Sequence, residues 1–235
     1  MANKTPNTKR DRRDEARRQR AEIERKASTR RRGRVLAIGV GAVVLVGAVV
    51  AIVLSQVLGG TNLLPGIQTG PAPWPPEYAH LPERLQAIGL PFLPSITPNL
   101  HRHDLLQIYV DGAPVQVPAQ IGIDQQAGKL TSLHTHDSTG IMHVESPTQR
   151  TFNLGEFFDV WGVRLSSTCI GGYCNDGSKT LKAFIDAVAW TKDPRTISLQ
   201  QHWDIVLAYG TPSELPNPIP RTYSGAISDS CAPSC

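Results

Sequence analysis

The hydrophobic pattern divides the chain at one long apolar run, Val35 to Leu54. The run contains no charged or strongly polar side chain and ends at Ser55 and Gln56. Because about 20 apolar residues match the ~30 Å hydrocarbon core of a bilayer, we predict one transmembrane helix over residues 35–56. Arginines stand directly before the run, whereas no positive charge follows it until Arg84, so the positive-inside rule places the N-terminus in the cytoplasm.

The alternative is a secretory signal peptide that is removed from the mature protein. Its apolar region is usually ~7–15 residues long and ends at a small-x-small cleavage site. The run here fits neither condition well, so we favour an uncleaved anchor. This predicts a single-pass protein of the cell membrane, with everything from about Gly59 onward in an extracytoplasmic compartment.

Charge is distributed unevenly about the predicted span. The whole chain carries +4 at pH 7, but residues 1–34 alone carry +9 and the remainder carries −5. Beside a membrane, such a basic cytoplasmic tail favours contact with anionic lipid headgroups, which contributes ~1 kcal/mol per basic residue near the surface. Binding of nucleic acid is the alternative use of a Lys/Arg cluster, and the membrane tether argues against it.

A stretch rich in Pro and Gly, residues 57–99, follows the span. It predicts a stiff, extended spacer that lifts a folded domain off the membrane, with one or two helical turns from Glu83 to Ile88 that end at Gly89. Prolines between residues 91 and 98 forbid regular structure, so we expect the folded core to begin after Asn99.

The pattern of apolar positions predicts an α+β domain over residues 100–211. From Leu105 to Ile123 it indicates two strands joined at Asp111-Gly112, a strong hairpin signal because both central residues of a type I′ turn need positive φ. Pro114 has no N–H to donate to a ladder, so the second strand should lie at a sheet edge.

A short helix and two further strands complete the predicted domain. Asn153 to Glu156 resembles a capping box, and the apolar and aromatic residues that follow recur at helical spacing up to Gly162. The strand candidates are Leu181 to Trp190 and Asp204 to Tyr209. This order is typical of one short helix packed on a mixed or antiparallel sheet, as a β-grasp-like fold or a distorted sandwich.

Three of the seven histidines lie in a predicted β-hairpin between Thr131 and Ser146, whose turn is formed by residues 137–140. A loop of two or four residues places His134 opposite His143, whereas a three-residue loop moves His143 to the other face. In the first register four possible ligands share one face: His134, His136, His143 and Glu145. Imidazole and carboxylate suit Zn²⁺ or Cu²⁺, so we predict a candidate metal site here.

A second His-x-His pair, His101 and His103, precedes the first predicted strand. It would complete this site or form another if it folds back beside the hairpin. Met142 should point to the opposite face, which disfavours a soft Cu⁺ site. The alternative interpretation is that the histidines are exposed or hydrogen-bonded residues of a polar sheet face.

All four cysteines follow the predicted span: Cys169, Cys174, Cys231 and Cys235. An even number of cysteines in an extracytoplasmic compartment favours disulfides over a metal cage, and neither spacing matches a zinc ribbon well. Three pairings are possible, and the spacing does not choose among them. The last two cysteines lie in a tail rich in Pro and Ser, residues 212–235, which should be irregular.

Four segments carry a family resemblance: Leu133-His-Thr-His-Asp137, Gly140-Ile-Met-His-Val-Glu145, Phe157-Phe-Asp-Val-Trp-Gly162 and Cys169-Ile-Gly-Gly-Tyr-Cys174. Together they resemble a group of uncharacterised, membrane-anchored bacterial proteins, over roughly residues 75 to 212. The resemblance implies an extracytoplasmic location, and it implies neither a reaction nor a metal.

The sequence leaves two functional hypotheses. The first is an extracytoplasmic domain that holds or passes a transition metal at the membrane; its catalytic version would use a metal-bound water, with Glu145 or Asp137 as base. The second is a non-enzymatic envelope protein that docks on a partner complex. The sequence contains no catalytic triad signature, phosphate loop or dinucleotide fingerprint, so an enzyme is the less favoured interpretation.

Overall fold

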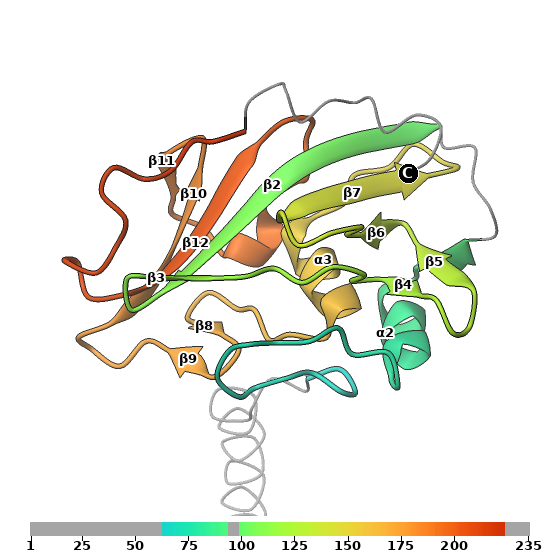
Figure 1. Ribbon diagram of the computed structural model, residues 1–235, viewed down its shortest axis with the longest axis horizontal. Coiled ribbons are helices and arrows are strands. Elements are labelled where there is room, and N and C mark those ends of the chain that lie inside the picture. The colour runs from blue at the N-terminus through green and yellow to red at the C-terminus, as the bar shows by residue number, and fades with distance from the viewer. Residues whose placement is uncertain (1–62, 94–98, 224–235) are drawn as a thin grey trace, which may run out of the picture. The chain divides into compact units, whose positions relative to one another are not determined.

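A mixed sheet forms the centre of the fold (Figure 1). The computed structural model describes residues 63–93 and 99–223. The strands of the central sheet are β2 Leu100–Val110, β3 Ala113–Val115, β6 Leu133–His134, β7 Ile141–Ser146, β10 Thr180–Ile185, β11 Val188–Trp190 and β12 Asp204–Gly210. Their order is β11-β10-β12-β2-β7-β6, with β3 paired to β2 outside this path. All neighbours are antiparallel except β12 and β2, which run parallel.

Several predicted features fall on parts of the chain that the structure does not describe. The predicted span at residues 35–56 and the basic tail at residues 1–34 lie outside the described residues, and so do Cys231 and Cys235. Within residues 63–93 and 99–223, no helix is both long enough and apolar enough to cross a membrane.

Strand β2 is longer than predicted because its two halves have different partners. From Leu100 to Leu105 it pairs with β7, and from Leu105 to Val110 it pairs with β12. The predicted start at Leu105 was therefore wrong, since the polar residues before it are held in the ladder by β7. The Asp111-Gly112 turn is confirmed, with φ of 50° and 80°. Among the described strands, β3 pairs with β2 alone, as expected of an edge.

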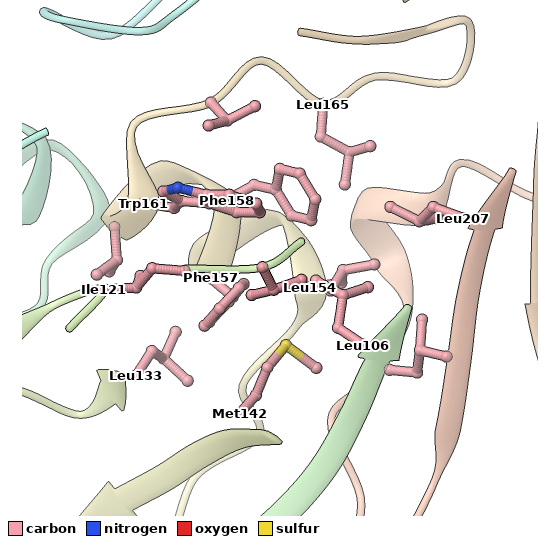
Figure 2. Close-up of a cluster of buried hydrophobic side chains, with 14 of the residues drawn as sticks. Leu106, Ile121, Leu133, Met142, Leu154, Phe157, Phe158, Trp161, Leu165 and Leu207 are labelled. Carbon is pink, nitrogen blue, oxygen red and sulfur yellow. The ribbon is translucent and has the colours of Figure 1, made fainter. Parts of the chain in front are cut away.

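Helix α3, Leu154–Trp161, packs on one face of the central sheet (Figure 2). Its capping box is confirmed: the Asn153 side chain accepts a hydrogen bond from the Glu156 N–H, and the Glu156 side chain accepts one from the Asn153 N–H. Gly162 ends the helix with a φ of 81°. The buried side chains between helix and sheet include Leu106, Leu133, Met142, Leu154, Phe157, Phe158, Trp161 and Leu207.

The segment before β2 packs on the domain, where the sequence predicted a spacer. Trp74 is only 2% exposed, and its ring meets the Trp161 ring edge-on, with 6.0 Å between centroids. The Trp161 indole N–H also donates to the Trp74 carbonyl at 3.0 Å. Burying an aromatic side chain contributes strongly to a core. The compact unit begins at Leu63, before the predicted domain boundary at residue 100.

Helix α2, Leu81–Ile88, packs on the domain as a second helix, whereas the predicted domain contained a single helix. It ends at Gly89, as expected. Arg84 on this helix is fully buried. Its guanidinium donates to the Asp159 carbonyl of α3 at 2.6 Å and pairs with the Glu77 carboxylate. Because a buried cation is costly without such partners, Arg84 fixes α2 against α3.

Two small sheets and a 3-10 helix complete the described part of the fold. They comprise β1 Phe92–Leu93, β5 Lys129–Thr131 and β4 Ile123–Asp124 in one sheet, β8 Cys169–Ile170 and β9 Tyr173–Cys174 in the other, and the 3-10 helix Pro194–Thr196. The single strand predicted from Leu181 to Trp190 is instead the β10–β11 hairpin, because Asp186 and Ala187 adopt positive φ of 51° and 65°. The predicted α+β class with a mixed sheet is confirmed.

A disulfide joins Cys169 to Cys174 across the β8–β9 hairpin. The sequence predicted disulfides without choosing a pairing, and the structure shows that Cys169 pairs with Cys174. The hairpin packs against Trp74: Gly171 has a φ of 51°, and a Cβ built on it would lie 2.2 Å from the Trp74 ring. Only glycine combines this backbone conformation with so close a contact.

Candidate metal centre

One face of three adjacent strands carries the predicted ligands. His103, His143 and His134 are direct neighbours across β2, β7 and β6, and His101 lies opposite Glu145. Facing residues of paired strands project to the same side of a sheet. The register that puts His134 opposite His143 is therefore confirmed, and the two histidines of β2 do lie beside the hairpin.

The alternate residues of β7 point to the other face. Met142 and Val144 alternate with His143 and Glu145, and both are buried in the hydrophobic core. Figure 2 shows Met142 among the apolar side chains that face α3, as predicted. Its thioether is therefore not available to the histidine cluster.

The hairpin loop brings His136 over the strands. Strand β6 ends at His134, so His136 belongs to the loop and not to the predicted strand. The Asp137 carboxylate accepts the Thr139 N–H at 2.9 Å, and the Gln120 amide donates to the His136 carbonyl at 3.0 Å. Asp137 thus caps the turn, and Gln120 holds the backbone that carries the His136 ring.

Four ligand atoms on this face lie within 4.8 Å of one another, from His134, His136, His143 and Glu145. The Nε2 atoms of His134 and His136 are 3.2 Å apart. The Glu145 Oε1 atom lies 3.9 Å from both His134 Nε2 and His143 Nδ1. Ligands ~2.0–2.1 Å from a tetrahedral Zn²⁺ are about 3.3 Å from each other. The His134–His136 pair already has the spacing of two zinc ligands, and Glu145 Oε1 lies slightly beyond that spacing from His134 and His143.

His134 is held in the tautomer that a metal requires. Its Nδ1 atom lies 2.9 Å from the Thr131 carbonyl oxygen, and since a carbonyl only accepts, Nδ1 carries the hydrogen. In the neutral ring the lone pair is then on Nε2, the atom nearest His136 and Glu145. A backbone carbonyl that orients the ring in this way is a common outer partner of a metal-bound histidine.

Burial keeps the central imidazoles in the neutral form that binds metals. His134 is fully buried, and this desolvation, with the neighbouring His136, lowers its pKa to about 3. Desolvation and the adjacent His134 likewise lower the pKa of His143. Burial raises the pKa of Glu145, an effect that the nearby imidazoles oppose. Binding a metal at neutral pH therefore requires no proton to leave these two histidines.

A second group of ligand atoms lies on the β2 side of His143. The atoms of His101, His103 and His143 are again within 4.8 Å of one another. The His103 ring centroid is 4.5 Å from those of both His101 and His143. Glu145 Oε1 lies 3.4 Å from His101 Nε2, so the carboxylate adjoins both groups. The structure therefore brings all six predicted ligands together on one sheet face.

Solvent adjoins the cluster on two sides. His101 is exposed at the β2 side. On the other side, His136 lines an open pocket of about 270 Å³ together with Gln120 and Leu130. Two of the possible ligands, His101 and His136, therefore lie next to solvent.

His103, His134 and His143 are only 3%, 0% and 5% exposed, so these three are not exposed histidines of a polar face. His134 is nevertheless hydrogen-bonded to the Thr131 carbonyl, which agrees with the other form of that alternative. Sequence reasoning missed the residues that position the ligands. The Thr131 group that orients His134 is a backbone carbonyl, which every residue type has, so no sequence signal could have identified it.

No protein-family model, curated protein or solved structure matches the chain. Function therefore rests on the geometry and chemistry of the site.

Proposed function

We propose that this chain is a single-pass membrane protein whose extracytoplasmic domain binds Zn²⁺ or Cu²⁺ through His134, His136, His143 and Glu145. One observation carries the proposal: ligand atoms from these four side chains converge within 4.8 Å in a largely buried site. The register of β6 and β7 and the hydrogen-bonded loop create this convergence.

A bound cation accounts for so many polar rings buried together. A buried polar atom that lacks its hydrogen bond costs about 1–3 kcal/mol. His143 Nδ1 is such an atom, since it is buried and has no hydrogen-bond partner among the described residues. A dication gives a partner to each lone pair that faces the centre of the cluster and so offsets these costs.

The ligand chemistry favours the two metals named. Imidazole and carboxylate suit Zn²⁺ and Cu²⁺, whereas Cu⁺ prefers thiolate and thioether ligands. Neither group of possible ligands among the described residues contains a cysteine, and Met142 belongs to the hydrophobic core. Three neutral imidazoles and one carboxylate would leave a bound dication with a single net positive charge.

Two observations support the extracytoplasmic location. The apolar run from Val35 to Leu54, with arginines before it, favours an anchor whose N-terminus is inside. The Cys169–Cys174 disulfide favours an oxidising compartment. The basic tail, residues 1–34, would then contact anionic headgroups. A reporter fused after Cys235 should be active only outside the cytoplasm, and activity inside would overturn this location.

Metal binding is tested by calorimetry on the full-length protein, purified in detergent without a histidine tag and stripped with a chelator. Zn²⁺ and Cu²⁺ are titrated separately into the wild type and a His134→Asn variant. The asparagine amide can still donate to the Thr131 carbonyl, whereas the Nε2 ligand atom is lost. We expect the affinity to fall at least about 100-fold, because loss of an outer partner alone costs 10–100-fold.

His80→Asn is the matched control. His80 is exposed and belongs to neither ligand group, so this variant loses an imidazole and should keep the wild-type affinity. Circular dichroism of the metal-free variants checks that both are folded. Equal affinities of the wild type and His134→Asn, or no binding of either metal to the wild type, would contradict the proposal and favour docking on an envelope partner.

A further inference from the structure

The two ligand groups overlap at His143. Its ring centroid lies 4.5 Å from that of His103 on one side and 4.5 Å from that of His136 on the other. The stacked ring of His134 is 5.2 Å away. Since one imidazole stands between two pairs of others, the cluster offers two neighbouring positions for a cation.

We propose that the cluster binds two metal ions side by side, one at His134 and His136 and the other at His101 and His103, with His143 and Glu145 between them. The inference rests on the proposed function, because it extends the same site from one ion to two. It assigns a role to all five histidines on this face of the sheet.

Each position has enough donors to hold an ion. His143 completes three imidazoles at the first position, and Glu145 adds a carboxylate that the two ions can share. Its Oε1 atom is 3.9 Å from His134 Nε2 and 3.4 Å from His101 Nε2, so the carboxylate adjoins both positions. Water can fill the remaining places at the second position because His101 is exposed.

The separation of the two positions suits a two-ion site. One ligand pair lies on β2 and the other on β6 and its loop, with β7 between them. An ion held between each pair and β7 would therefore be about one strand spacing, ~4.7–4.9 Å, from the other ion. Ions that share ligands in two-metal sites are typically about 3.5–4 Å apart. The sheet itself therefore sets a spacing close to what is required.

Repulsion between the two ions should make the second bind more weakly than the first. Two dications repel each other four times as strongly as two unit charges at the same distance. Glu145 is the single acidic residue in the two ligand groups of the described chain. The first position has the buried, pre-oriented His134 and should fill first. The second dissociation constant should therefore be at least about tenfold larger than the first.

Stoichiometry gives the direct test. Untagged full-length protein in detergent is titrated with Zn²⁺, and bound zinc per chain is measured by elemental analysis after removal of free metal. We expect two zinc ions per chain in the wild type. A His101→Ala/His103→Ala double variant should bind one ion per chain, and His80→Asn should still bind two.

Copper provides a second measurement that needs no variant. Two Cu²⁺ ions within a few ångströms of each other couple magnetically, so the paramagnetic resonance signal per copper should fall as the second equivalent binds. Two equivalents with undiminished, independent signals would overturn the side-by-side arrangement. This measurement keeps the inference testable if the double variant does not fold.

The outcomes separate this inference from the proposed function. One ion per wild-type chain overturns the two-ion site and leaves metal binding intact. Two ions in the double variant overturn the assignment of the second position to His101 and His103. No bound metal in the wild type overturns both.

Discussion

The two faces of β2 and β7 are made by alternating residues of the same strands, yet they differ in nearly every property. On the face toward α3, Leu106 and Met142 are buried in a continuous apolar cluster (Figure 2). Val144 belongs to the same cluster. On the other face, His103 and His143 are almost as fully buried, but their neighbours are other imidazoles and a carboxylate.

This difference shows how strongly the register of β7 is constrained. A slip of one residue would move Met142 and Val144 away from α3 and bring His143 and Glu145 into the core. The packing of Leu106, Met142 and Val144 depends on volume and shape, whereas the histidine face needs particular atoms at particular distances. Changes on the first face should therefore reduce stability, and changes on the second should alter metal binding.

The largest expected loss of stability comes from the apolar face. Phe157→Ala removes a fully buried ring of α3, and the cavity should lower the free energy of unfolding by about 3–5 kcal/mol. Denaturant unfolding of the metal-free protein measures this loss. Zinc affinity of the folded fraction should be unchanged, and a parallel loss of affinity would show that the two faces are not independent.

Neighbouring residues of β7 offer a closer comparison. Met142→Ala should lower the free energy of unfolding of the metal-free protein by about 2–5 kcal/mol and leave zinc affinity unaltered. His143→Ala should cost less, because the cavity is offset by removal of a buried nitrogen that lacks a hydrogen bond. It should instead abolish tight zinc binding. A greater loss of stability in His143→Ala than in Met142→Ala would contradict the distinction between the two faces.

Zinc itself should stabilise the fold through the polar face. At free zinc 100 times the dissociation constant, the free energy of unfolding should rise by about 2.7 kcal/mol, since the ion binds the folded state. Thermal unfolding with and without zinc measures the increase. His134→Asn should show little of it, whereas an equal rise in that variant would indicate binding elsewhere.

The smallest effect concerns the cap of α3. Asn153→Ala removes the side chain that accepts the Glu156 N–H, and should cost about 1 kcal/mol. Asn153→Asp keeps an acceptor at the same place and is the matched control. Chemical denaturation measures the free energy of unfolding of both variants. Because the cap belongs to the apolar side, neither variant should change zinc affinity.

The features that could be predicted from the sequence depend on residues close together in the chain. The capping box at Asn153 and the turn at Asp111-Gly112 are local hydrogen-bond and backbone preferences. The turn formers of the histidine hairpin likewise marked its loop, but they left two registers open, and the structure shows the one that sets His134 opposite His143. All six residues of the candidate site could be named in advance because imidazole and carboxylate are recognisable ligand types.

What could not be predicted depends on contacts between distant residues. The polar residues at the start of β2 form a strand only because β7 pairs with them. Trp74 was assigned to a spacer because its neighbours are prolines, whereas its partners, Trp161 and Gly171, lie far along the chain. The placement of His136 in the loop also depends on a distant residue, Gln120. Local periodicity does not encode such pairings.

The parallel pairing of β2 with β12 has a consequence for the order of folding. β7 pairs Leu100 with Ser146, whereas β12 pairs Leu105 with Asp204, about twice as far along the chain. Closing the longer loop costs more entropy, and distant pairings form slowly. The three strands that carry the histidines should therefore assemble first, with the other edge of β2 briefly unpaired and open to aggregation. A metal ion bound at that stage would stabilise the three assembled strands before β12 pairs with them. The supply of metal would therefore influence the yield of folded protein.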